Sequence, residues 1–329
     1  MIRQNALKVC ALAGMLIGSA APSSAAFSFF NTFFDTDWTS VGIGGMRGSG
    51  TETLTLTGVS GTVTGAYLFW HGPTDSSDPL ANAVATFNST TITGTNIGIS
   101  QDNNWGFANS QAYRADVTSL VTGNGDYELS DFTKPGFIDV NGASLFVLFD
   151  DADSTNNRDL VLFNGNDSNV SSAFDPQGWD VSLSGINYTS GTASIQLTVS
   201  DGQDFGNDEG ISLNGGNLIP TGPNWQGELG VDIVGNGSLW DQKSFDVTSF
   251  LSPGLNNLHL TTGAPVSDAL SLIVAAIDLP AGAAPPIDPP PPMTPVPEAA
   301  SFGLVAVLGL FATAALRRRP RAGGIQAVA

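Results

Sequence analysis

Two histidines, His71 and His259, are the residues best suited to acid–base chemistry near neutral pH. A Ser-His-Asp triad would require His71 to contact a serine and an aspartate, but the sequence contains no Gly-x-Ser-x-Gly motif that would identify the serine. A zinc site is also disfavoured, because the chain has one cysteine and no His-x-x-x-His spacing. The sequence therefore predicts no catalytic residue and a protein that is not an enzyme.

Two acidic loops place oxygen ligands at short spacing. Calcium takes six to eight oxygen ligands, which neighbouring carboxylates and amides can supply, so calcium is the one cofactor that the sequence suggests. Glycines at positions 202, 206 and 210 would let the second loop fold around an ion. The alternative, which the turn-forming composition favours, is two solvated hairpin loops without an ion. The candidate ligands are Asp150, Asp151 and Asp153 in the first loop and Asp201, Asp204, Asn207, Asp208 and Glu209 in the second.

Three tryptophans stand in polar, turn-rich surroundings. Trp105, Trp225 and Trp240 have Asn, Asp or Gln as near neighbours, and sugar sites combine a flat aromatic face with amides that bind hydroxyls. They are therefore the candidate glycan-binding residues. The commoner alternative for a loop tryptophan is that it closes the end of a β-sandwich.

Composition excludes further classes of protein. The 30 acidic and 11 basic residues give a net charge of -19, which disfavours a nucleic-acid partner because phosphate binding needs a basic surface. One cysteine cannot form an intramolecular disulfide. Many Gly, Ser, Thr, Asn and Asp residues favour short strands joined by turns over long helices.

The first 26 residues have the pattern of a secretory signal peptide. Arg3 and Lys8 precede an apolar run over residues 9–20, and small residues follow up to Ala26. Signal peptidase is therefore an expected partner during export. Its cleavage would also remove Cys10.

The C-terminal region has three successive parts. A proline-rich linker at residues 281–295 precedes Val296, Pro297 and Glu298, and an uncharged apolar segment at residues 299–316 is long enough to cross a bilayer. The cluster Arg317, Arg318 and Arg319 follows it, within a segment 296–321 and before a tail at residues 322–329.

This tripartite pattern resembles the PEP-CTERM sorting signal of Gram-negative bacteria that make exopolysaccharide. The resemblance implies processing by an exosortase, with an inner-membrane intermediate held by the apolar helix and a final place on the outer surface or in the extracellular matrix. Ala299 stands where the motif has a second proline, which bears on the efficiency or site of processing. The alternative is a plain single-span anchor.

The body of the chain predicts two tandem β-sandwich units, all-β and jelly-roll-like, at residues 27–165 and 166–280. Alternating or continuous apolar runs at residues 51–58, 65–70, 83–87, 143–149 and 159–163 predict strands, and Asn164-Gly165 predicts a turn. The sequence Asp116-Val117-Thr118 and the sequence Asp246-Val247-Thr248 precede similar strands, which indicates an internal duplication.

The second copy resembles the galactose-binding-like jelly roll found as an accessory module in glycosidases. The matching residues are 211–215 and 245–257, which close strands and turns, so the resemblance implies a fold and leaves sugar binding open. Together these features predict an exported structural or adhesive protein of the extracellular polysaccharide matrix, with that polysaccharide as a possible partner. The alternative is a secreted hydrolase or its carbohydrate-binding accessory module.

Overall fold

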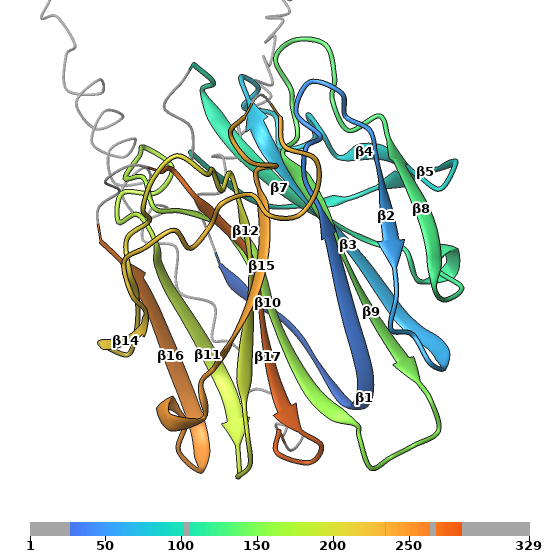
Figure 1. Ribbon diagram of the computed structural model, residues 1–329, viewed down its shortest axis with the longest axis vertical. Coiled ribbons are helices and arrows are strands. Elements are labelled where there is room, and N and C mark those ends of the chain that lie inside the picture. The colour runs from blue at the N-terminus through green and yellow to red at the C-terminus, as the bar shows by residue number, and fades with distance from the viewer. Residues whose placement is uncertain (1–26, 102–105, 234, 264–267, 285–329) are drawn as a thin grey trace, which may run out of the picture. The chain divides into compact units, whose positions relative to one another are not determined.

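The computed structural model describes residues 27–101, 106–233, 235–263 and 268–284, and these residues form an all-β protein (Figure 1). The predicted all-β class is thus confirmed. In these ranges the only helical elements are two single 3-10 turns, and no helix has the length and apolar character needed to cross a bilayer. The predicted signal peptide and sorting segment lie outside the described residues. The elements are β1 (Ser28–Ile43), β2 (Glu52–Leu56), β3 (Thr62–Thr74), β4 (Val84–Phe87), β5 (Thr90–Thr93), β6 (Thr95–Ser100), β7 (Asn109–Asp116), η1 (Thr118–Leu120), β8 (Gly125–Ser130), β9 (Gly142–Asp150), β10 (Arg158–Ser168), β11 (Asp180–Tyr188), β12 (Ser194–Ser200), β13 (Ile211–Leu213), β14 (Gly216–Ile219), β15 (Trp240–Asp246), η2 (Thr248–Phe250), β16 (Gly254–Thr262) and β17 (Ser271–Pro280).

One large sheet runs through both sandwich units. Its order is β15-β12-β17-β10-β1-β9-β3-β7-β6. The strand β1 joins the two halves, because its first part pairs with β10 and its second part pairs with β9. The change of partner follows a register shift between Phe33 and Thr36, where Asp35 has a φ of 50°. Such an irregularity bends a strand, so one strand can serve both units.

Two four-stranded sheets cover the halves of the large sheet. Their orders are β2-β8-β4-β5 in the first unit and β11-β16-β13-β14 in the second. Each encloses an apolar core with its half of the large sheet, since strand residues alternate between faces. A third cluster, here called the middle core, lies on the opposite face of the large sheet and joins both units. Its buried members are Phe69, Ala112, Phe146, Leu148, Leu160, Leu162, Trp240, Ile273, Val274 and Ala276.

The two units repeat the same local structure. The Thr118 amide donates to Asp116 Oδ1 over 2.9 Å, and the Thr248 amide donates to Asp246 Oδ1 over 2.8 Å. Each threonine hydroxyl then accepts a backbone amide that is distant in sequence, that of Ala66 in β3 or of Ala193 just before β12, over 2.9 Å. The small sheets also have matching strand orders. The duplication inferred from sequence therefore has a structural counterpart in both units.

The predicted turn at Asn164-Gly165 is wrong. The strand β10 continues through both residues to Ser168, and a register shift between Asn164 and Asp167 takes up the irregularity. Pairing with β17 on one side and β1 on the other outweighs the local turn preference of the dipeptide. The expected unit boundary at residue 165 consequently falls inside a strand.

Candidate functional site

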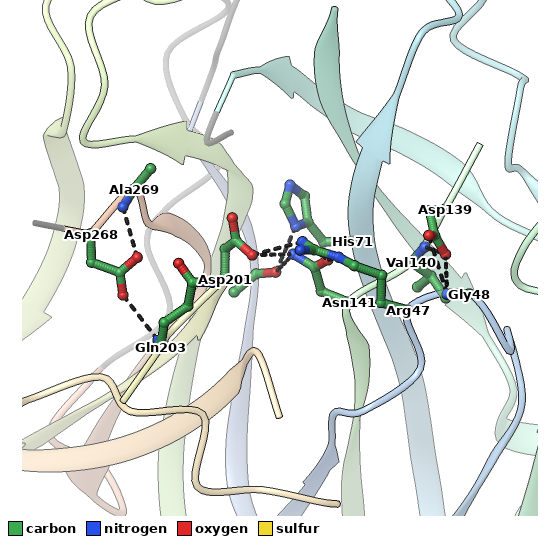
Figure 2. A network of polar contacts seen from close by, with 11 residues as sticks. Arg47, Gly48, His71, Asp139, Val140, Asn141, Asp201, Gln203, Asp268 and Ala269 are labelled. Atoms are coloured by element: carbon green, nitrogen blue, oxygen red, sulfur yellow. Dashed lines mark hydrogen bonds and ion pairs between the residues drawn. The ribbon is translucent and has the colours of Figure 1, made fainter. Parts of the chain in front are cut away.

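A buried polar cluster lies where the two units meet, and Figure 2 shows it. Alternation along the strands explains its position. In β3, Trp70 points into the first core, so the neighbouring His71 points to the other face. In β12, Val199 points into the second core, so Ser200 also points away from it. Both polar side chains therefore face the region between the units.

His71 and Ser200 form the centre of the cluster. The distance from His71 Nδ1 to Ser200 Oγ is 2.7 Å, and both residues are fully buried. Asn141 Nδ2 donates to the same Ser200 Oγ over 3.0 Å. Because the serine oxygen accepts from the amide, its own proton is free to point at the imidazole nitrogen. This is the arrangement in which a histidine can take a proton from a hydroxyl nucleophile.

Arg47 connects this pair to a carboxylate. Its guanidinium donates to Asn141 Oδ1, with the closest nitrogen at 2.5 Å, and to Asp201 Oδ1 at 2.7 Å. Arg47 comes from the loop after β1, whereas Asp201 directly follows β12. Since Asp201 is 1% exposed and Arg47 is 14% exposed, this is an ion pair largely shielded from water. It joins the first unit to the second.

A second buried carboxyl group, Asp268, lies on the side of Asp201 away from His71 (Figure 2). Burial, followed by the charges of Asp201 and Asp208, raises the pKa of Asp268 to about 9. Its oxygens accept the amides of Gln203 and Ala269, each over 2.9 Å. The cluster thus combines a carboxylate paired with arginine and a carboxyl group that is neutral at pH 7. Acid–base catalysis uses pairs of titratable groups whose environments give them different pKa values.

Other buried carboxylates hold the loops around the cluster. Asp208 Oδ2 accepts the amides of Asn224 and Trp225 over 2.8 Å, and burial raises its pKa. Asp241 accepts the amides of Gly227 and Glu228, and burial raises its pKa to about 6. These groups order the chain between β14 and β15, and they are structural partners of the cluster.

The acidic residues predicted as calcium ligands do not gather in one place. Asp150, Asp151 and Asp153 accept backbone amides two residues ahead in an exposed hairpin loop between β9 and β10. In the second loop Asp201 meets Arg47 and Asp208 holds Trp225, while Asp204 is exposed. Over the described part of the chain, no group of three or more His, Cys, Asp or Glu side chains is placed to hold a metal ion. Calcium binding by either loop, including Asn207 and Glu209, stays a prediction.

For two of the three tryptophans the predicted sugar-binding role is wrong. Trp225 and Trp240 are fully buried, and Trp240 Nε1 donates to Ser144 Oγ over 2.8 Å. An indole enclosed on all sides offers no face to a sugar, so the alternative of a tryptophan that fills the interior holds for both. Trp105 lies outside the described residues.

Sequence reasoning found His71 but not its partners. The residues missed are Arg47, Asn141, Ser200 and Asp268. Strand alternation could have placed His71 and Ser200 on like faces. No local pattern predicts that β3 and β12, far apart in the order of the large sheet, approach each other.

Comparisons with known proteins found no matching family model and no matching curated protein. Solved structures gave matches of low similarity. One is a peptide-N4-(N-acetyl-β-D-glucosaminyl)asparagine amidase, with a TM-score of 0.27, 10% identity, and coverage of 74% of this chain and 96% of that chain. Recombinant peptide:N-glycanase F gave a TM-score of 0.23 at 8% identity, covering 74% and 96%. PNGase F, a glycosylasparaginase from Flavobacterium meningosepticum, gave 0.22 at 10% identity, covering 76% and 96%.

These matched chains are enzymes, so the comparison contradicts the prediction that this protein is not an enzyme. That prediction is withdrawn. At TM-scores this low the likeness carries no argument about mechanism, and the activity has to be inferred from the chain's own polar side chains.

Proposed function

We propose that this protein is an exported hydrolase that cleaves an ester or amide bond carried by an extracellular glycan. The observation that carries the proposal is the 2.7 Å contact between His71 Nδ1 and Ser200 Oγ, with Asn141 donating to the same oxygen. His71 takes the hydroxyl proton as Ser200 attacks the carbonyl carbon, and it returns that proton to the leaving group. Arg47 holds Asn141 in position through its side-chain oxygen.

Access to this pair requires movement. Ser200 and His71 are both fully buried, so a substrate reaches the hydroxyl only when the surrounding loops open. Exclusion of water strengthens the electrostatic contacts among the buried groups, which favours proton transfer once the substrate is bound.

A shallow groove supports glycan as the substrate class. It has a volume of about 370 Å³ and combines the aromatic rings of Phe30 and Tyr67 with the polar side chains of Asn31, Arg114 and Asp116. Aromatic edges with hydrogen-bonding groups beside them suit the mixed surface of a sugar. Tyr67 and His71 lie on one face of β3, four residues apart, which is about 13 Å along a strand. A chain of sugars bound in the groove could therefore extend toward the buried pair.

Export is part of the same proposal. The signal-peptide pattern and the PEP-CTERM-like segment ending in Arg317, Arg318 and Arg319 support processing by signal peptidase and exosortase. The place of action would be the outer surface or the extracellular polysaccharide matrix. The acidic composition suits a soluble body that does not adhere to anionic membranes.

The test measures turnover on a panel of O-acetylated and N-acetylated polysaccharides, with released acetate as the readout. Ser200→Ala and His71→Ala should each lower turnover by at least about 100-fold, the smaller end of the range for general-base catalysis. The matched controls are Ser182→Ala and His259→Ala, which change an exposed serine on β11 and a half-exposed histidine on β16. Both controls should retain the wild-type rate.

Labelling by a fluorophosphonate probe, located by mass spectrometry, tests access to Ser200 without relying on any variant. Modification of Ser200 supports the proposal. No turnover of any substrate together with no labelling refutes it, and retention on a polysaccharide column would then leave glycan binding as the function.

A further inference from the structure

Two carboxyl groups that take no part in the His71–Ser200 contact are buried in the second unit, and the charge of one acts on the other. Asp167 is near the end of β10 and is 7% exposed, and Asp175 is in the loop between β10 and β11 and is 5% exposed. The charge of Asp175 is the strongest one acting on Asp167. Neither residue belongs to the acidic loops that the sequence singles out.

Each of the two side chains has one oxygen without a partner. Neighbouring backbone amides lower the pKa of each group: those of Ser168, Gln177 and Gly178 act on Asp175, and that of Asp180 acts on Asp167. The remaining atoms, Asp167 Oδ1 and Asp175 Oδ2, are buried with no hydrogen-bond partner. A buried carboxylate oxygen left in this way is costly, and most buried polar atoms in proteins are paired. Something is therefore expected to bind between these atoms.

The charges that act on this pair are negative. Asp180 adds a third carboxylate, and its own ion pair is with His259 on the neighbouring strand β16. Burial and the charge of Asp175 raise the pKa of Asp167 to about 8, and burial also raises the pKa of Asp175. The polypeptide by itself thus leaves both carboxylates poorly stabilised, and a positive ion would reverse this.

We propose that Asp167 and Asp175 bind a divalent cation of the calcium class, with Asp167 Oδ1 and Asp175 Oδ2 as its anionic ligands. The donor atoms are hard oxygens, which calcium prefers, and calcium accepts irregular arrangements of six to eight of them. Among the described residues no group of three or more His, Cys, Asp or Glu side chains is placed to hold a metal ion, so backbone carbonyls and water would supply the remaining ligands. The carbonyls of Ser168 and Asn169 lie close to Gly178 in the same loop.

The ion would fasten the loop at residues 169–179 to β10. That loop delivers Trp179, which is 3% exposed, into the second core. The proposed cation site is a structural site, and its test does not depend on the proposed hydrolase activity.

The test is calcium-dependent thermal unfolding of the whole protein. Calcium at a hundredfold excess over its Kd should raise the unfolding temperature by on the order of 5 °C relative to chelator, given the size of the body. Asp167→Asn and Asp175→Asn should abolish this shift. Asp153→Asn changes an exposed carboxylate in the hairpin loop between β9 and β10, and this variant should show the same calcium-dependent shift as the wild-type protein.

A second measurement uses terbium in place of calcium. Excitation of tryptophan should sensitise terbium luminescence in the wild-type protein, excess calcium should quench it, and Trp179→Phe should weaken it. This readout remains available if an Asp→Asn variant fails to fold.

Two results would overturn the proposal. A calcium shift that persists in the Asp167→Asn/Asp175→Asn double variant places the ion elsewhere. The absence of any calcium shift in the wild-type protein shows that the two carboxyl groups hold no calcium ion.

Discussion

The ion pair between Arg47 and Asp201 is the contact whose loss should most weaken the junction of the two units. Replacing Arg47 with Met keeps much of the apolar part of the side chain but removes its charge. It also removes the hydrogen bonds that Arg47 donates to Asn141 and Asp201. Asp201 is then left 1% exposed without the guanidinium. Stability of the body is therefore expected to fall.

The magnitude follows from the burial of the two partners. Removing one partner of a buried ion pair costs roughly 3–5 kcal/mol, because the other charge stays desolvated. Arg47 is 14% exposed, and Asn141 Nδ2 lies 3.4 Å from Asp201 Oδ1, so some compensation remains. We expect a loss of about 3 kcal/mol for Arg47→Met. Asp201→Asn leaves the guanidinium of Arg47 unpaired with a carboxylate, but this group is 14% exposed and keeps its hydrogen bond to Asn141, so the cost should be smaller, about 1.5 kcal/mol.

The assay is urea unfolding followed by tryptophan fluorescence, with both single variants and the double variant. The double variant should be less destabilised than the sum of the singles by at least about 1 kcal/mol, since the two residues share one interaction. Lys243→Met is the control, because its ion pair with Glu228 is more exposed and should contribute less than about 1 kcal/mol. If Arg47→Met costs no more than Lys243→Met, or if the single changes simply add, the pair does not hold the junction together.

Two further predictions concern the repeated turn and the buried carboxyl group. Thr118→Val and Thr248→Val should each cost about 1–3 kcal/mol in urea unfolding, because each leaves the amide of Ala66 or Ala193 without its acceptor. The two losses should be similar and additive, and a large difference between them would show that the repeats are not equivalent in energy. The raised pKa of Asp268, about 9, means that the folded state binds a proton that the unfolded state releases above about pH 4. Its contribution to stability is therefore fully present below about pH 4 and is lost as the pH rises through about 9. Asp268→Asn should flatten this fall in a series of unfolding curves from pH 5 to 9, and an unchanged slope would contradict the assignment.

Local sequence patterns predicted the strands but not their partners. Continuous apolar runs predicted the strands around residues 65–70 and 143–149, because a strand buried on both faces is apolar whatever it pairs with. The Asp-Val-Thr repeats were recognised because their hydrogen bonds lie within two residues of each other. Asn164-Gly165 misled the prediction, since pairing on both sides of β10 outweighed a preference that concerns only the dipeptide itself.

By itself, the sequence determined the all-β class and the internal repeat. These properties follow from the spacing of residues along the chain, which can be read directly from the sequence. Only the tertiary structure decided that β3 and β12 meet, that Trp225 and Trp240 are enclosed, and that Asp167 and Asp175 each bury one oxygen without a hydrogen-bond partner. The burial of a side chain and the charges around it depend on which distant segments of the chain come close. His71 and Ser200 are 129 positions apart, and no local sequence pattern predicts that they meet.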